Sequence, residues 1–309
     1  MIVEFLPVLV CVAGLLGDRV LGEPGWHPLE VFGRCAMSVE KKLNNRASKA
    51  RGAAALTLLL VVPVGGMVVI QQNLSNPWIR GIFDTGILVL VIGWQSMKEH
   101  AIRVVEPLIR RDLDGARQSL SMIVSRETGN MNPQQVVGST MESVLENGHD
   151  CVVASLFWYA LLGPAGAVLH RLVNTLDAMW GYRNARFQSF GWAAARLDDI
   201  LGWMPARLTA ICYGLAGSFP GAMRSWKRQI GQHKSPNAGL VMASGAGALG
   251  VTIGGPVVYE GKRQDKPWLG GGEPAQVGDI GRAIQLVERS LAVWMVSYAL
   301  VWFLYIQYL

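Results

Sequence analysis

Acidic residues with helical spacing stand at the edge of an apolar run in ESVLENGHDCVVASLFWYALLG, residues 142–163. Glu142 and Glu146 are four residues apart, so both carboxylates lie on one face of a helix, and Asp150 falls near the end of that helix. Like charges at this spacing repel each other, and a divalent cation such as Mg²⁺ would remove the repulsion because it prefers carboxylate oxygens. The spacing predicts a metal site, and a solvated acidic face is the alternative.

Two further stretches mix acids with arginines. In NTLDAMWGYRNARF, residues 174–187, Asn174 and Asp177 share one helix face. In RLDDILGWMPARL, residues 196–208, two adjacent aspartates stand between arginines. Structural salt bridges would account for one or two such pairs. Because unpaired buried charge is costly and ionisable groups at membrane depth tend to be functional, we expect the set to include functional residues.

The glycine-rich stretch SPNAGLVMASGAGALGVTIGGP, residues 235–256, carries the signals of a helix start. Ser235 is the predicted N-cap, followed by a proline in the first helical position. Small residues recur at every fourth position from Gly239 to Gly247, which lets another helix approach closely. The helix N-terminus at Ser235–Asn237 can also hold a phosphate, although close helix packing is the simpler role of this stretch.

The composition favours a membrane protein as the body that positions these residues. Hydrophobic residues make up 51% of the 309 residues and charged residues only 16%, against about 25% charged in a soluble globular domain. Too little polar surface is therefore available to cover a water-facing protein of this size. The four cysteines are far apart and show no metal-ligand spacing, so neither a disulfide framework nor a zinc site is expected.

The apolar segments predict an all-α, polytopic integral membrane protein with amphipathic helices and some segments that either re-enter the membrane or are simply buried. A span needs roughly 20 apolar residues, and only 52–72, 79–97 and 290–309 meet this length comfortably. Shorter apolar segments lie near 1–17, 151–169, 203–219 and 239–255. We expect one membrane-embedded domain, 1–309, made of N-terminal membrane helices with a basic loop (1–97), a motif-bearing region (98–289) and a C-terminal membrane helix (290–309).

The remaining segments connect these helices. A basic loop at 34–51 predicts a cytoplasmic side, and no nucleic-acid motif accompanies it, so nucleic-acid binding is not expected. Apolar residues from 105 to 123 recur at threes and fours and predict one amphipathic helix, with another starting near Pro133. YEGKRQDKPWLGGGEPAQ, residues 259–276, reads as a flexible lid or linker. Common nucleotide-binding and hydrolase motifs are absent from the sequence.

At these clusters the sequence resembles the cobinamide(-phosphate) synthase family of cobalamin biosynthesis, the CbiB/CobD type. The resemblance runs nearly end to end and rests on GLLGDRVLGEPGWHPLEVFGR, RDLDGAR, IVSRET, ESVLEN, DCVVASLFWYAL, NTLDAMWGYRNARF, FGWAAARLDDILGWMPARLTA, SPNAGLVMASGAGALGV and GDIGRA. It implies a multi-pass enzyme of the cell (inner) membrane that joins aminopropanol, or its O-phosphate, to a propionate side chain of adenosylcobyric acid. The bond formed is an amide, and ATP with Mg²⁺ drives the reaction.

The resemblance also suggests roles for residues of these motifs. The implied catalytic residues are Arg126, Glu127, Glu142, Glu146, Asn147, Asp150, Arg183 and Arg196, with Glu142, Glu146 and Asp150 holding the metal. The implied substrate-binding residues are Asn174, Asp177, Tyr182, Asp198, Asp199, Arg207, Ser235 and Asn237. The implied partners are the corrinoid, the amine and the lipid bilayer, with a homo-oligomer and other membrane enzymes of the pathway as further expectations.

Two functions of other classes remain as alternatives. The sequence departs from the family pattern at Glu127, Gly148, Cys151 and Ser155, which would suit a non-catalytic membrane scaffold or signalling paralogue. A corrinoid or ion transporter would also place polar groups near apolar helices, but the sequence shows no clear inverted halves.

Overall fold

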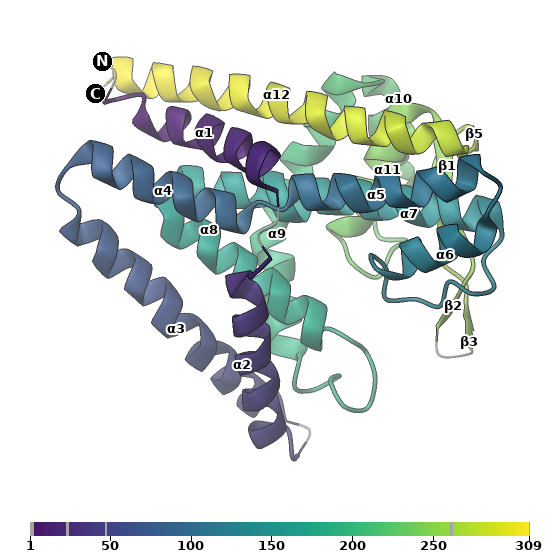
Figure 1. Cartoon of the computed structure of the whole chain (residues 1–309), viewed down its shortest axis with the longest axis horizontal. Helices are drawn as coiled ribbons and strands as arrows, with labels where there is room; N and C mark the ends of the chain where they lie inside the picture. The colour runs from purple at the N-terminus through teal and green to yellow at the C-terminus, as the bar shows by residue number, and fades with distance from the viewer. Residues whose placement is uncertain (1–2, 23–24, 47, 260–261, 309) are drawn as a thin grey trace. The chain divides into compact units, whose positions relative to one another are not determined.

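The computed structural model describes residues 3–22, 25–46, 48–259 and 262–308 (Figure 1). Within 258–264 it describes only the backbone of 258–259 and 262–264. The described chain is mostly helical. The helices are α1 (Leu6–Leu21), α2 (Pro28–Leu43), α3 (Lys49–Asn73), α4 (Pro77–Val91), α5 (Trp94–Ile109), α6 (Leu113–Ser121), α7 (Pro133–Gly148), the π-helical segment η1 (His149–Val153), α8 (Ala154–Trp180), α9 (Trp192–Ala216), α10 (Phe219–Gln229), α11 (Ala238–Leu249) and α12 (Val277–Gln307). Five short strands lie between α11 and α12: β1 (Val251–Gly254), β2 (Val257–Tyr259), β3 (Lys262–Gln264), β4 (Trp268–Gly270) and β5 (Glu273–Pro274).

Within the described residues, four helical stretches are long and apolar enough to cross a membrane, by length and composition. They are Lys49–Asn73, Pro77–Ile109, Pro133–Trp180 and Val277–Gln307. The predicted class, a mostly helical polytopic membrane protein, is confirmed. The C-terminal helix is longer than predicted, because it begins at Val277 and not near residue 290.

The contacts within the chain define two compact units. Unit 1 comprises Met1–Gly93, Asp150–Gly202 and Tyr298–Leu309, and unit 2 comprises Trp94–His149 and Trp203–Ser297. Each unit is described by itself below, and the single membrane domain of the sequence analysis stays a prediction.

In unit 1, a short connection at 74–76 joins α3 to α4, and each of the two helices packs against α8. Asn76 is the N-cap of α4, and its Oδ1 accepts the backbone N–H groups of Trp78 and Ile79 at 2.9 and 3.2 Å. A proline follows it in the first helical position. Helix α4 also packs against α1, where the missing side chain of Gly14 makes room for Leu88. The segment predicted as one helix, 79–97, is broken at residues 92–93, so its last residues belong to α5.

The core of unit 1 joins α2, α3, α8 and α9 around Trp180 and Phe190, whose rings meet edge to face at 5.1 Å. Gly52 on α3 lies so close to this core that a Cβ atom there would be 1.9 Å from the carbonyl oxygen of Phe190. The basic residues predicted to form a loop at 34–51 lie mostly on α2 and at the start of α3. The loop prediction was wrong because the polar face of an amphipathic helix resembles a loop in composition.

Helix α8 bends where the sequence predicted a break. Gly163 has φ 64° and ψ −159°, a conformation that a residue with a side chain rarely adopts, and Pro164 follows it. Helix α9, by contrast, continues through Pro205 as one helix from Trp192 to Ala216. Between α7 and α8 the chain forms the π-helical segment η1, a feature frequently found at functional sites.

In unit 2, the predicted amphipathic helix is two helices, α5 and α6. Arg111 adopts φ 60°, which ends α5, and the Asp112 side chain accepts the backbone N–H of Gly115 at 2.9 Å to start α6. A single apolar periodicity runs through both helices, so the break was invisible in the pattern. The start of α7 at Pro133 is confirmed, with Asn132 and Gln135 forming a capping box.

Helix α11 is almost wholly buried and packs against α10, as its small residues predicted. At Gly247 a Cβ atom would lie 2.3 Å from the Ser225 hydroxyl. The helix begins at Ala238, two residues later than predicted, although the Ser235 hydroxyl still accepts the backbone N–H of Ala238 at 3.2 Å.

The strands form two small sheets, one with the order β4-β1-β5 and one with β2 and β3. In the first, β1 pairs antiparallel with β4 and parallel with β5. The Gln229 side chain extends this ladder, since it donates to the Gly270 carbonyl and accepts the Gly270 N–H, both at 2.8 Å. The lid or linker predicted at 259–276 is therefore wrong for most of its described residues, and residues 260–261 of it lie outside them.

Candidate functional site

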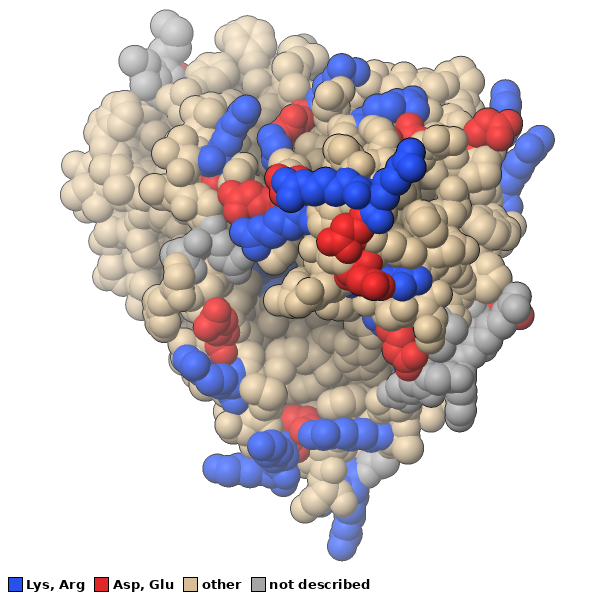
Figure 2. Space-filling view, turned by 45° about the vertical axis from the view of Figure 1, so that its right-hand side comes forward, with Lys and Arg blue, Asp and Glu red and all other residues tan. Residues whose placement is uncertain are grey.

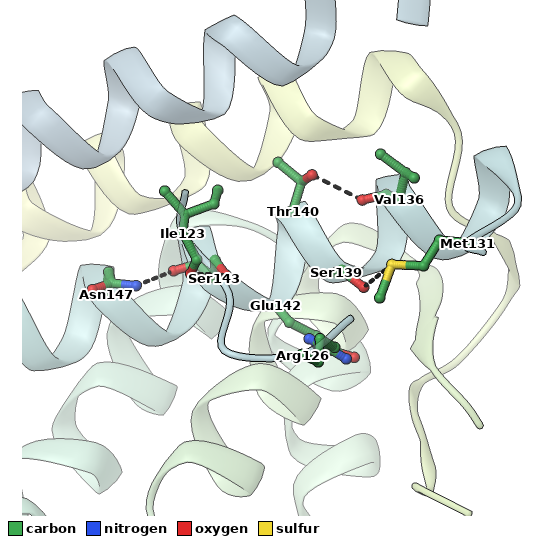
Figure 3. A network of polar contacts seen from close by, with 9 residues as sticks. All are labelled: Ile123, Arg126, Met131, Val136, Ser139, Thr140, Glu142, Ser143 and Asn147. Carbon is green, nitrogen blue, oxygen red and sulfur yellow. Dashed lines mark hydrogen bonds and ion pairs between the residues drawn. The ribbon is translucent and has the colours of Figure 1, made fainter. Parts of the chain in front are cut away.

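Arg126 and Glu142 form a buried ion pair in unit 2, near the other polar contacts of α7 (Figure 3). Glu142 lies on α7, and Arg126 lies on the loop that precedes it. The side chains are only 6% and 5% exposed, and Arg126 Nη2 donates to Glu142 Oε2. The alternative of a solvated acidic face is therefore wrong for Glu142.

The fold brings a turn with positive φ values against this carboxylate. Gly254, at the end of β1, has φ 91°, and a Cβ atom there would lie 3.6 Å from Glu142 Oε1 and 2.5 Å from the Pro267 carbonyl oxygen. One turn earlier on α7, a Cβ atom at Gly138 would lie 3.7 Å from the Gly254 nitrogen. The Gly138–Glu142 face of α7, the end of β1 and the segment before β4 therefore meet at Glu142.

The second terminal nitrogen of Arg126, Nη1, is buried and has no hydrogen-bond partner among the described residues. Leaving a buried donor unpaired costs about 1–3 kcal/mol, and more for a charged group. A guanidinium can bind a carboxylate or phosphate through two parallel N–H groups, and here one of its arms is committed to Glu142. The arrangement suits the binding of an oxygen acceptor from a ligand.

The other polar residues of α7 mostly bond to the chain near them. The Asn147 side chain donates to the Ser143 carbonyl at 2.8 Å, and the Thr140 hydroxyl donates to the Val136 carbonyl at 2.8 Å (Figure 3). Glu146 follows Glu142 one turn later and is partly exposed. These contacts stabilise α7. Of its two glutamates, Glu142 is the buried one.

Among the described residues, no group of three or more His, Cys, Asp or Glu side chains lies close enough to hold a metal ion. The predicted set of Glu142, Glu146 and Asp150 stays a prediction. Asp150 lies in the segment η1 and belongs to unit 1, and the carboxylate of Glu142 is already neutralised by Arg126.

Other predicted residues of unit 2 lie around α9 and the start of α11. The Arg207 guanidinium stacks on the Trp203 ring at 4.0 Å, and its Nη1 donates to the Trp203 carbonyl at 2.6 Å and lies 3.5 Å from the Asn237 side-chain oxygen. Burial lowers the pKa of Arg207. Glu127 follows Arg126 on the loop and is exposed.

A second polar network lies in unit 1, and its central residue was not predicted. Arg171 on α8 donates through Nη1 to the Cys151 sulfur at 3.0 Å and to the Asn174 side-chain oxygen at 3.4 Å. Asn174 in turn donates to Asp198 on α9 at 3.4 Å. An arginine inside an apolar helix is the signal that would have identified Arg171 from the sequence.

Carboxylates also gather where α8 and α9 lie together in unit 1. Asp177 and Asp199 are close enough to repel each other, and Arg196 Nη1 pairs with Asp199 at 3.2 Å. Burial raises the pKa of Asp199, and the nearby Arg196 and Arg183 oppose that increase. Tyr182 and Arg183 lie exposed on the loop after α8.

The structure thus divides the sixteen predicted residues into two sets. Unit 2 holds Arg126, Glu127, Glu142, Glu146, Asn147, Arg207, Ser235 and Asn237, and unit 1 holds Asp150, Asn174, Asp177, Tyr182, Arg183, Arg196, Asp198 and Asp199. On the surface shown in Figure 2, acidic and basic side chains lie intermixed and form no separate acidic or basic face. Buried charge, not surface charge, therefore distinguishes the candidate site.

Four apolar helical spans and charged groups buried within the helices define a multi-pass membrane protein with a polar site. The family model described as "CobD/Cbib protein" matches residues 11–287, and the chain belongs to that family. No solved structure matches the chain.

Curated relatives agree with this assignment. The chain is 46% identical to the cobalamin biosynthesis protein CobD of Chromobacterium violaceum, over 94% of this chain and 93% of the relative. It is 45% identical to the protein of the same name from Stutzerimonas stutzeri, over 93% and 95%. It is 38% identical to that from Mycobacterium tuberculosis, over 88% of each chain. The expected family is confirmed.

Proposed function

We propose that this chain is the membrane enzyme of cobalamin biosynthesis that makes adenosylcobinamide or its phosphate. It joins a propionate carboxyl of adenosylcobyric acid to the amine of aminopropanol or aminopropanol O-phosphate. Family membership supports the reaction. The observation that carries the site is the buried Arg126, with one arm on Glu142 and one nitrogen without a partner.

The chemistry requires a carboxylate to become an electrophile. ATP supplies the phosphoryl group that turns the carboxylate into an acyl phosphate, whose leaving group is phosphate. Arg126 Nη1 is suited to bind an anionic oxygen of the activated carboxyl or its phosphate. A preorganised donor in a buried site stabilises developing negative charge far more than the same donor in water. Glu142 fixes the position of the guanidinium by pairing with its Nη2 group.

Mg²⁺ fits carboxylates of unit 1 better than the Arg126–Glu142 pair. Mg²⁺ usually takes one or two carboxylates, with waters and substrate phosphates completing its shell. Asp177 and Asp199 are two neighbouring carboxylates that repel each other, and a cation would relieve that repulsion. Glu142 is 5% exposed and paired with a buried arginine, whereas Asp199 is 24% exposed and its partner Arg196 is 54% exposed, so water and phosphate oxygens can reach it. When bound, Mg²⁺ would neutralise the phosphate charges of ATP, and Arg183 and Arg196 would assist it.

The decisive assay uses the purified full-length protein in nanodiscs. Adenosylcobyric acid, ATP and Mg²⁺ are supplied with aminopropanol or with its O-phosphate, and the amide product is identified by mass. We expect ATP-dependent product with one or both amines. Absence of product with either amine would refute the proposal and favour the scaffold or signalling alternative. The same assay, with the two amines compared, identifies the preferred amine, and mixing with other membrane enzymes of the pathway tests them as partners.

A further inference from the structure

Arg171 lies in the second half of α8, in unit 1, and is partly buried. Among the described residues, its guanidinium donates to the Cys151 sulfur at 3.0 Å and to the Asn174 side-chain oxygen at 3.4 Å, in both cases through Nη1. Neither partner is a carboxylate. A partly buried cation without a counter-ion is costly, and ionisable groups within the helices of a membrane protein tend to mark binding sites.

One edge of this guanidinium has no acceptor from the described residues. Its Nε is buried without a hydrogen-bond partner among them. In an arginine, Nε–H and the adjacent Nη2–H point in the same direction and can bind two oxygens of one carboxylate or phosphate. Arg186 uses this edge on Glu40, through Nε at 3.0 Å and Nη2 at 2.6 Å. Beside Nη2 of Arg171 lies Gly93, where even a Cβ atom would be 3.5 Å away, so no side chain of that residue covers the edge.

A row of polar residues on α8 leads from Arg171 to acidic residues of α9. Arg171, Asn174 and Asp177 follow one another at steps of three residues. Asn174 donates to Asp198 on α9 at 3.4 Å, and Asp198 adjoins Asp199 in the sequence. Asp177 and Asp199 are the two carboxylates proposed above to hold Mg²⁺. From Arg171 to Asp177 the helix rises by about 9 Å, a length that a triphosphate chain can span.

We propose that the Nε–Nη2 edge of Arg171 binds phosphate oxygens of ATP, while the carboxylates of the same row hold the Mg²⁺ that accompanies the nucleotide. The inference rests on the proposed ATP-dependent amide synthesis and adds a residue to its nucleotide site. A substrate carboxylate would also fit a guanidinium edge, but it is too short to reach from Arg171 to a metal at Asp177. A polyphosphate places anionic oxygens at both ends of the row. Arg171 makes and breaks no covalent bond; it positions the nucleotide and neutralises part of its charge.

The test measures two affinities of the full-length protein in nanodiscs by calorimetry, one for ATP with Mg²⁺ and one for adenosylcobyric acid. Arg171→Gln removes both the charge and the planar fork. We expect it to weaken ATP binding by roughly 10- to 100-fold, the scale of losing hydrogen bonds to a charged group. Its affinity for adenosylcobyric acid should stay within a few-fold of wild type. Arg171→Lys keeps the charge without the fork and should recover only part of the lost ATP affinity.

The matched control is Arg34→Gln on α2, which removes an exposed arginine of the same unit and should keep both affinities. Should Arg171→Gln fail to fold, Arg171→Lys carries the comparison, because loss of the fork alone should weaken ATP binding. Unchanged ATP affinity in a folded variant overturns the proposal. So does a loss of affinity for adenosylcobyric acid, alone or together with ATP, since Arg171 would then hold a substrate carboxylate or support the fold. If the wild-type protein does not bind ATP, the proposed ATP-dependent reaction itself is refuted.

Discussion

The two units each contain a buried glutamate paired with an arginine, and the pairs differ in how fully they are satisfied. In unit 1, Glu40 on α2 receives Arg186 Nε at 3.0 Å and Nη2 at 2.6 Å, and Asn44 donates to it at 2.7 Å. In unit 2, Arg126 reaches Glu142 through Nη2, while Nη1 is buried with no hydrogen-bond partner in the part of the chain that the structure describes.

The difference separates a structural pair from a ligand-binding one. The arginine of the Glu40 pair is 59% exposed, so water can satisfy its remaining donors. Arg126 is 6% exposed and has no such access. Buried charges that lack partners are costly, and proteins tend to place them where a ligand completes the shell. By this criterion Arg126 belongs to the site, and Arg186 holds the loop after α8 on α2.

The largest expected effect distinguishes the two arginines by activity. Arg126→Lys keeps the charge opposite Glu142 but loses the planar fork that can bind a second acceptor. We expect amide formation to fall by on the order of 10²-fold, the scale of losing one electrostatic stabiliser. The matched Arg186→Lys variant should keep wild-type turnover in nanodiscs. Equal activities of the two variants would remove the distinction between the pairs.

Breaking the buried Arg126–Glu142 pair should also lower the free energy of unfolding. Glu142→Gln leaves the Arg126 charge buried without its counter-ion, which costs about 3–5 kcal/mol for a broken buried pair. Relief of repulsion with Glu146, expected from spacing alone, is worth only ~0.2–0.5 kcal/mol. Thermal unfolding in one detergent should therefore show a clear loss. A Glu142→Gln variant as stable as wild type would show that the pair is not buried in the folded protein.

The Glu40 pair should make stability depend on pH. Hydrogen bonds from Arg186, together with Asn44, hold the pKa of Glu40 below its ordinary value. A carboxyl group with a lowered pKa contributes stability at pH above its unfolded-state pKa, and the contribution is lost as pH falls through the folded-state pKa. Melting temperatures measured from pH 7 down to the acid range should therefore fall less steeply in Glu40→Gln than in wild type. Parallel curves would exclude this role.

The smallest effect belongs to an exposed pair of the same chemistry. Arg117 on α6 pairs with Asp114 at 2.8 Å, and the aspartate is 90% exposed. An i, i+3 ion pair on a helix surface contributes about 0.2–0.5 kcal/mol. Asp114→Asn should lower the free energy of unfolding by no more than that and leave turnover unchanged. A larger loss would mean that the surroundings of the pair, and not its burial, set its contribution.

Short-range features of this fold were readable from the sequence because they depend on neighbouring residues. Asn132 and Pro133 start α7, the turn at 74–76 joins α3 to α4, and the glycine at 163 bends α8. Apolar runs of sufficient length predicted three of the four candidate membrane spans among the described residues, whereas Pro133–Trp180 was expected only as a shorter apolar segment near 151–169. Breaks without a special residue signal were missed, as at Arg111 between α5 and α6.

The amino-acid sequence by itself therefore determined the helices, the membrane character and the family, and it named Arg126 and Glu142 as candidates. Only the tertiary structure decided which charges meet. Glu40 and Arg186 lie 146 residues apart in the sequence and form one ion pair. Periodicity records which side of a helix a residue occupies, but the partner on that side comes from distant segments. For that reason the unused nitrogen of Arg126 could not be derived from spacing.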